Sequence, residues 1–406
     1  ENAVSLIEGN RGLFDGVTDA GEFSTAELAK LLRAPVIMVI DCDKVTRTAA
    51  AMMLGCLHLD PEVDIRGVIL SRVNGNRHAS VIRRSIEEYT GLPVYGTVPR
   101  LPDLPFVQRH MGLIPPDEHD NVQLALEVAG TIARDYLDIS ALLRIARSAP
   151  PWIIDAFPQA APLNETGEDR PVIGIIKDKA FQFYYQENIE ALADRGAEVV
   201  PISALAEEVL PPVDALYIGG GFPETQAGRL AANASFRRSL RAAADAGLPI
   251  YAECGGFIYL GKSLTIGDKR YPMVGALPVA FRMENKLQGH GYTTLVADAG
   301  NPFFPVGTTI TGHEFHYCRI LSPRVKKMHT AFQVLKGKGI DGIREGMCKK
   351  GILAGFTYVH ALGAPTWANA LVECARRHRR TKQKQTRIFI ESGSTVAFDE
   401  QNIPII

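Results

Sequence analysis

A cysteine that comes directly after an apolar run is the residue of this chain best suited to act as a nucleophile. Residues 248–252 (LPIYA) predict a buried strand, and Cys254, Gly255 and Gly256 follow it, ahead of a helical apolar pattern. A thiol on a tight turn between a strand and a helix stands clear of the sheet. Backbone amides and the helix N-terminus can then stabilise a thiolate and an oxyanion. This combination favours a catalytic cysteine over a small buried one.

A cysteine nucleophile requires a base, and the best candidate is a histidine at the end of another apolar run. His360 follows residues 353–359 (LAGFTYV), a pattern that predicts a strand with the imidazole at its end. Two further histidines, His313 and His316, lie in the segment GHEFHY. Their spacing differs from the i, i+4 pair of a zinc-binding HExxH helix, which disfavours a metal site there.

One segment matches the pattern of a phosphate-binding loop but has the wrong context. Residues 256–263 (GFIYLGKS) fit GxxxxGK[ST]. In a true phosphate loop the first glycine follows the strand at once, and the intervening backbone forms the cradle. Here the cysteine turn comes first and large apolar residues occupy the loop positions. We therefore interpret the segment as the first turns of a helix that packs on the sheet.

Composition and charge exclude several classes of protein. The 406 residues contain 44 Lys and Arg against 45 Asp and Glu, a net charge of -1, which argues against nucleic-acid binding through bulk positive charge. A hydrophobic fraction of 46% with 22% charged residues excludes a disordered, collagen-like or coiled-coil chain. The six cysteines include no CxxC pair, so we expect neither a disulfide framework nor a zinc site, and we expect a cytoplasmic protein. The longest charge-free run, 351–372, contains polar residues and a proline that disfavour a membrane helix.

Strand and helix patterns alternate along most of the chain, which predicts an α/β protein with parallel sheets. In the first half the expected elements are strands at 34–40, 65–70 and 93–98 and helices at 46–57 and 79–90. In the second half they are strands at 172–176, 215–218 and 248–252 and helices at 188–196 and 236–246.

A proline-rich stretch that turns polar separates the two halves. We therefore expect a first domain at residues 1–150, a linker at 151–170 and a second α/β domain at 171–375. Residues 376–406 are expected to form a basic tail, because seven Lys or Arg fall between positions 376 and 387.

Short motifs recur in a fixed order along both halves. The second half contains FYYQEN (183–188), GGGFPE (219–224), AECGG (252–256), GHEFHY (312–317) and YVH (358–360). The first half contains IEGNRGLFDG (7–16), VID (39–41), VTR (45–47), GVIL (67–70) and RHMGL (109–113). Together they resemble the cobyrinic acid a,c-diamide synthases and their cobyric acid synthase relatives, over roughly residues 1–372. The resemblance implies a P-loop-NTPase-like domain followed by a class I glutamine amidotransferase domain.

The resemblance implies a ligase that uses glutamine and ATP to amidate the a and c acetate carboxylates of a modified tetrapyrrole. Cys254 would form a thioester with glutamine, with His360 as the base and with amides of Gly220, Gly221 and Gly255 as the oxyanion hole. ATP would activate the substrate carboxylate in the first domain, where the released ammonia attacks it. The implied partners are these small molecules alone, with no nucleic acid and no membrane, and a homodimer is compatible with the pattern.

The resemblance also implies a metal and nucleotide site in the first domain. Glu8 and Asp15 correspond to carboxylates that hold Mg²⁺ near the ATP phosphates, a role that suits a hard, oxygen-seeking cation. Asp41, Thr46 and Arg47 follow a predicted strand, at the sheet edge where α/β folds bind ligands. We expect these three residues to contact nucleotide or substrate.

Three departures from the family pattern leave alternatives open. The phosphate loop expected before Glu8 is not seen, so we expect a fragment that lacks the first strand, the phosphate loop and the first helix. Leu362 stands where glutaminases of the wider class carry a carboxylate, so no orienting acid is evident. Residues 361–365 (ALGAP) resemble relatives that amidate sirohydrochlorin or siroheme-type rings. A glutaminase-only protein and a nucleotide switch of the partitioning-ATPase type are further alternatives.

Overall fold

The computed structural model describes residues 4–101, 105–106, 108–109, 112–113, 121–151, 170–321 and 328–391. The chain divides into two compact units, Glu1–Pro158 and Gln159–Ile406. Their boundary falls within the linker expected at 151–170. Within the described residues, no helix is both long and apolar enough to cross a lipid bilayer.

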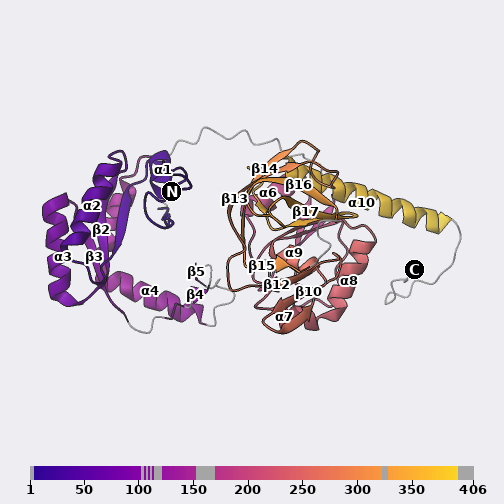
Figure 1. Cartoon of the computed structure of the whole chain (residues 1–406), viewed down its shortest axis with the longest axis horizontal. Coiled ribbons are helices and arrows are strands. Elements are labelled where there is room, and N and C mark those ends of the chain that lie inside the picture. Colours follow the sequence, from indigo (N-terminus) through magenta and orange to yellow (C-terminus); the bar gives the residue numbers. More distant parts are fainter. Residues whose placement is uncertain are drawn as a thin grey trace. The chain divides into compact units, whose positions relative to one another are not determined.

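The first unit contains a parallel sheet flanked by helices (Figure 1). Its strands pair in the order β1-β2-β3, which are β1 (Val36–Asp41), β2 (Ile65–Val73) and β3 (Val94–Pro99). The helices described in this unit are α1 (Thr25–Leu32), α2 (Arg47–Leu59), α3 (Gly75–Thr90), α4 (Val122–Tyr136) and α5 (Ile139–Arg147), and β4 (Gln108–Arg109) pairs with β5 (Gly112–Leu113). Val68 and Leu70 of β2 pack with Ile82 and Ile86 of α3 in the core. These apolar residues point to a sheet buried by its helices, as the alternating pattern predicts.

The second unit is built on a sheet with the strand order β19-β14-β13-β16-β17-β18-β9-β8-β6-β7. Neighbouring strands from β18 onward are parallel, namely β18 (Ile352–Gly355), β9 (Ile250–Glu253), β8 (Ala215–Ile218), β6 (Val172–Ile176) and β7 (Glu198–Ile202). The remaining strands are antiparallel, namely β19 (Tyr358–Val359), β14 (Thr309–His316), β13 (Gly289–Ala297), β16 (Thr330–Lys336) and β17 (Arg344–Lys349). A smaller sheet has the order β11-β10-β12-β15, with β11 (Lys269–Pro272), β10 (Ser263–Ile266), β12 (Ala280–Met283) and β15 (Cys318–Ile320).

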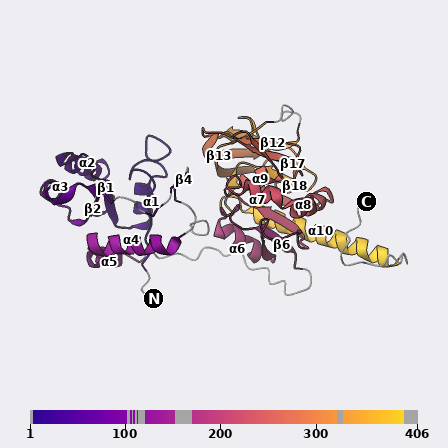
Figure 2. The same cartoon turned by 90° about the horizontal axis from the view of Figure 1, so that it is seen from below.

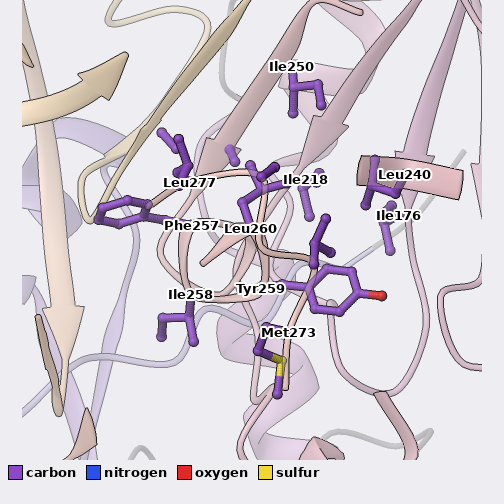
Figure 3. Packing of buried hydrophobic residues seen from close by; sticks show 14 of the residues in the cluster. Ile176, Ile218, Leu240, Ile250, Phe257, Ile258, Tyr259, Leu260, Met273 and Leu277 are labelled. Carbon is purple, nitrogen blue, oxygen red and sulfur yellow. The ribbon is translucent and has the colours of Figure 1, made fainter. Parts of the chain in front are cut away.

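The inner strands β6 and β8 carry only glycine and apolar or aromatic residues, because both of their faces are buried. Ile218 of β8 and Ile250 of β9 join one core cluster, which Figure 3 shows with residues of α8 (Ala234–Asp245) and α9 (Gly255–Leu260). Tyr217 and Tyr251 point to the opposite face and join a second cluster, with Trp367 of α10 (Thr366–Glu391). Helices α6 (Gln186–Asp194) and α7 (Ala227–Ala232) complete the unit. The turn after β9 is thus held between two packed layers.

Two stretches differ from the sequence-based expectation. The apolar run 353–359 is not one strand: β18 ends at Gly355, and β19 begins at Tyr358 and pairs with β14. The buried carboxylate of Glu345 accepts hydrogen bonds from the backbone amides of Phe356 and Thr357, which takes both amides out of a strand ladder. A side-chain acceptor from another strand cannot be read from an apolar run.

The basic residues after position 375 continue a helix. Helix α10 extends to Glu391, as Figure 2 shows, so the basic residues 376–391 belong to a helix. Arg376 is only 7% exposed and donates to the carbonyl oxygen of Arg195 at 3.1 Å. Arg379 pairs with Asp214 at 3.2 Å. The first basic residues thus anchor the helix to the rest of the second unit, and residues 392–406 lie outside the described residues.

Candidate active site

Cys254 occupies a strained turn between β9 and α9. Its backbone has φ 43° and ψ -95°, a conformation that residues with a Cβ rarely adopt. The turn is fixed on both sides, because the Cys254 amide donates to the Gly355 carbonyl at 2.8 Å and the Cys254 carbonyl accepts from the Ile258 amide at 3.0 Å. The strand, turn and helix predicted around this cysteine are therefore all present, and the side chain is directed by backbone geometry.

Three candidate glycines lie beside this turn. Gly220 and Gly221 follow β8, the neighbour of β9, and a Cβ added to Gly255 would lie 3.0 Å from the Gly221 amide nitrogen. Gly221 has φ 155°, and a Cβ there would lie 2.2 Å from the Ala180 carbonyl oxygen. Gly221 has no room for a side chain because the Ala180 backbone lies against it, and a side chain at Gly255 would be tight against the Gly221 backbone. The structure thus brings together the three glycines that the resemblance indicated.

The thiol of Cys254 is buried and neutral in this conformation. Burial raises the pKa of this thiol to about 12, and interaction with the Tyr358 hydroxyl acts in the opposite direction but is the smaller effect. The sulfur lies 3.7 Å from the Phe315 carbonyl oxygen, to which the thiol can donate. A buried thiolate would lose its hydration, so the thiol of Cys254 keeps its proton in this conformation.

His360 follows β19 and lies against residues of α6. Its ring centroid is 4.6 Å from that of Tyr185, and its Nδ1 accepts a hydrogen bond from the Leu362 amide at 3.2 Å. Its Nε2 lies 3.6 Å from a carboxylate oxygen of Glu187. With Nδ1 accepting, the proton of the neutral ring is on Nε2 and faces this carboxylate. Glu187 belongs to the FYYQEN motif, but nothing in the sequence indicated that it reaches the histidine.

Glu253 links the strand of the nucleophile to the strand of the histidine. Its carboxylate accepts hydrogen bonds from the Val359 amide at 2.9 Å and from the Tyr217 hydroxyl at 2.8 Å. Burial raises the pKa of this carboxyl to about 7. Glu253 precedes Cys254 and Val359 precedes His360, so one hydrogen bond fixes the two strand ends to each other. The sequence analysis does not single out Glu253, although it lies in the AECGG motif directly before the cysteine.

The other histidines of the GHEFHY segment have structural partners. His313 stacks on Tyr358 with ring centroids 5.0 Å apart, and His316 stacks on Phe356 at 3.8 Å. His316 Nδ1 lies 2.8 Å from the Cys318 carbonyl oxygen. Across the part of the chain that the structure describes, no group of three or more His, Cys, Asp or Glu could hold a metal ion. The phosphate-loop match at 256–263 is likewise structural, because α9 is completely buried there.

The candidate residues of the first unit lie on exposed chain. Asp41 ends β1 and accepts a hydrogen bond from the Arg72 guanidinium at 2.8 Å, and the Arg47 guanidinium lies 4.7 Å from the centre of the Tyr89 ring. Thr46 precedes α2 without a side-chain capping bond. These three residues share the carboxyl end of β1, as the sequence predicts. Two further acids, Glu8 and Asp15, are exposed, and Asp15 accepts from the Gly12 amide at 3.0 Å.

Comparison with known proteins identifies both units. Residues 172–366 match the model of the CobB/CobQ-like glutamine amidotransferase domain, and residues 1–108 match the model of an AAA domain. The cobyrinate a,c-diamide synthase of Magnetococcus marinus is 40% identical over 370 residues, which cover 90% of this chain and 78% of that protein. The synthase of Methanothermobacter thermautotrophicus is 42% identical over 367 residues, covering 90% and 80%. The resemblance and the fold class inferred from the sequence are therefore confirmed, and the chain belongs to the cobyrinate a,c-diamide synthase family.

Proposed function

We propose that this protein amidates the a and c acetate carboxylates of cobyrinate, with glutamine as the nitrogen donor and ATP as the activating cosubstrate. One observation supports the proposal above the others: Cys254 lies on a strained turn, beside backbone segments that only glycine allows to approach. That geometry suits a nucleophile with an adjacent oxyanion hole. The relatives named above are cobyrinate a,c-diamide synthases, which supports this substrate.

In the proposed glutaminase reaction the Cys254 sulfur attacks the side-chain amide carbon of glutamine. The thiol proton passes to Nδ1 of His360, which gives up its hydrogen bond from the Leu362 amide to accept it. Amides of Gly220, Gly221 and Gly255 stabilise the negative charge that develops on the amide oxygen. Cleavage of the C–N bond releases ammonia, with the proton returned by His360, and leaves a thioester. Water then hydrolyses the thioester, which gives glutamate and restores the thiol.

In the first unit, we propose that Asp41, Thr46 and Arg47 contact ATP or the substrate carboxylate. When bound, ATP would supply the phosphoryl group that makes the carboxylate reactive toward ammonia. Mg²⁺ usually takes one or two protein carboxylates together with phosphate and water oxygens. Glu8 and Asp15, two exposed carboxylates in one unit, fit that partial ligand set, and we propose them as its protein ligands.

The test replaces Cys254 by serine in the whole enzyme. Cys254→Ser should abolish glutamine-dependent amidation and glutaminase activity but retain amidation with ammonium chloride, because the two half-reactions use different units. Survival of glutamine use would contradict the nucleophile assignment. Loss of both activities in a folded variant would contradict the division of labour.

The same assay separates the candidate substrates. Cobyrinate is expected to be converted to the diamide, whereas turnover of sirohydrochlorin alone would favour a siroheme-type ring. Glutamine hydrolysis without any ATP-dependent amidation would leave a glutaminase. We further propose a cytoplasmic homodimer, which fractionation of the source cells and light scattering of the purified protein would test.

A further inference from the structure

The hydroxyl group of Tyr358 lies in the same small space as the nucleophile and the proposed oxyanion hole. The phenol lies close enough to the Cys254 thiol to lower its pKa, in opposition to the larger effect of burial. A Cβ built on Gly220 would lie 1.9 Å from the Tyr358 hydroxyl oxygen, so the phenol is in contact with the backbone of that glycine. Tyr358 is 7% exposed. A buried hydroxyl therefore lies beside both the thiol and a glycine of the proposed oxyanion hole.

Aromatic contacts hold this phenol in place. The His313 ring stacks on Tyr358 with an interplanar angle of 11°, and His313 Nδ1 lies 3.1 Å from the Tyr185 hydroxyl. The Tyr185 ring in turn lies against His360, with centroids 4.6 Å apart. A continuous series of contacts thus leads from Tyr358 through His313 and Tyr185 to His360. A donor held in this way needs little rearrangement when charge appears, which is the condition for effective electrostatic stabilisation.

We propose that Tyr358 is a catalytic residue of the glutaminase reaction, whose hydroxyl stabilises the Cys254 thiolate by donating a hydrogen bond to the sulfur. This inference rests on the proposed function, in which Cys254 is the nucleophile. The phenol keeps its own proton: the thiol proton goes to His360, and the O–H group only donates to the charge left on sulfur. A charge-assisted hydrogen bond matters most where water is excluded, because an isolated thiolate would otherwise be strongly disfavoured.

The experiment compares Tyr358→Phe with Tyr259→Phe in the otherwise intact protein. Tyr259 is a matched control, because it is also buried, at 0% against 7% exposed, and its hydroxyl has no hydrogen-bond partner among the described residues. Tyr358→Phe should lower the glutaminase kcat about 10- to 100-fold with little change in KM. It should also slow alkylation of Cys254 by iodoacetamide about tenfold at pH 8, a property that a purely structural residue would not change. Tyr259→Phe should change both by less than twofold.

Folding is checked by circular dichroism, and a second variant covers the case in which phenylalanine is not tolerated. Fluorotyrosine at position 358 keeps the shape of the side chain and is a stronger hydrogen-bond donor, so alkylation at pH 7 should become faster. Unchanged kcat and alkylation in folded Tyr358→Phe, or unchanged alkylation with fluorotyrosine, would overturn the proposal. Glutaminase activity that survives in Cys254→Ser would instead overturn the proposed function, so the two failures are distinguishable.

Discussion

Burial of the nucleophile predicts an unusual pH dependence for its chemical modification. The pKa of Cys254 is raised to about 12, chiefly by loss of hydration. At pH 8 a thiol with that pKa is ionised in about 1 molecule in 10⁴, compared with about 1 in 10 for an ordinary thiol of pKa about 9. Iodoacetamide reacts with the thiolate. Cys254 in the ligand-free enzyme should therefore react about 10³-fold more slowly than a small thiol.

The assay follows carboxamidomethylation of the peptide that carries Cys254 by mass spectrometry, from pH 7 to pH 10. Because the ionised fraction grows tenfold per pH unit below the pKa, the rate should rise tenfold per unit across this range. The same chain unfolded in urea provides the control and should level off near pH 9. Restricted access alone would slow the folded protein but leave that plateau in place. A plateau below pH 10 in the folded enzyme would therefore refute burial of the charge as the cause.

Two carboxyl groups, those of Glu187 and Glu345, give further predictions for activity and for stability. Glu187→Gln should lower the glutaminase kcat about two- to fivefold, a modest loss because the pair with His360 is partly exposed, whereas Glu190→Gln on the same helix should leave kcat unchanged. Adding Leu362→Glu to Glu187→Gln should restore activity. Failure to do so in a folded double variant would contradict a role for Glu187 in orienting His360. Burial raises the pKa of Glu345 to about 8. Its contribution to the free energy of unfolding is therefore present below about pH 4.5 and lost as pH rises through 8. In urea unfolding, Glu345→Gln should reduce the loss of stability over this pH range by about 3–5 kcal/mol. An unchanged dependence of stability on pH would contradict this prediction.

The sequence predicts those parts of the fold that depend on local pattern. Strands at 172–176 and 215–218 have the predicted bounds, because an apolar run between breakers is enough to define a doubly buried strand. The nucleophile turn was predictable for the same reason: strand, cysteine, two glycines and helix are consecutive. The helix at 79–90 begins earlier than predicted, at Gly75, because the polar residues of its first turn carry no apolar periodicity.

The remaining features depend on contacts between distant residues, which periodicity does not encode. Glu187 and His360 are far apart in the chain, and only the packing of α6 near β19 brings them to 3.6 Å. Tyr358 was read as one more apolar residue of a strand, and its contact with Gly220 follows from the break after Gly355. The charge of the residues after 375 suggested a solvent-exposed tail, whereas the Arg376 side chain is buried and donates to the backbone carbonyl of Arg195.

The bond between Glu253 and Val359 has a consequence for the shape of the large sheet. In strand order, β19 and β9 are separated by six steps, which in a flat sheet would place them about 29 Å apart at roughly 4.8 Å per step. A hydrogen bond of 2.9 Å between their ends requires the antiparallel part to curl round and close on itself. A small cavity lies inside that ring, lined by residues that include Leu295, Ile310 and Phe332. The curling of this sheet thus joins the residues that precede Cys254 and His360, the proposed nucleophile and base. Packing substitutions in strands remote from the thiol are expected to lower activity by separating β19 from β9.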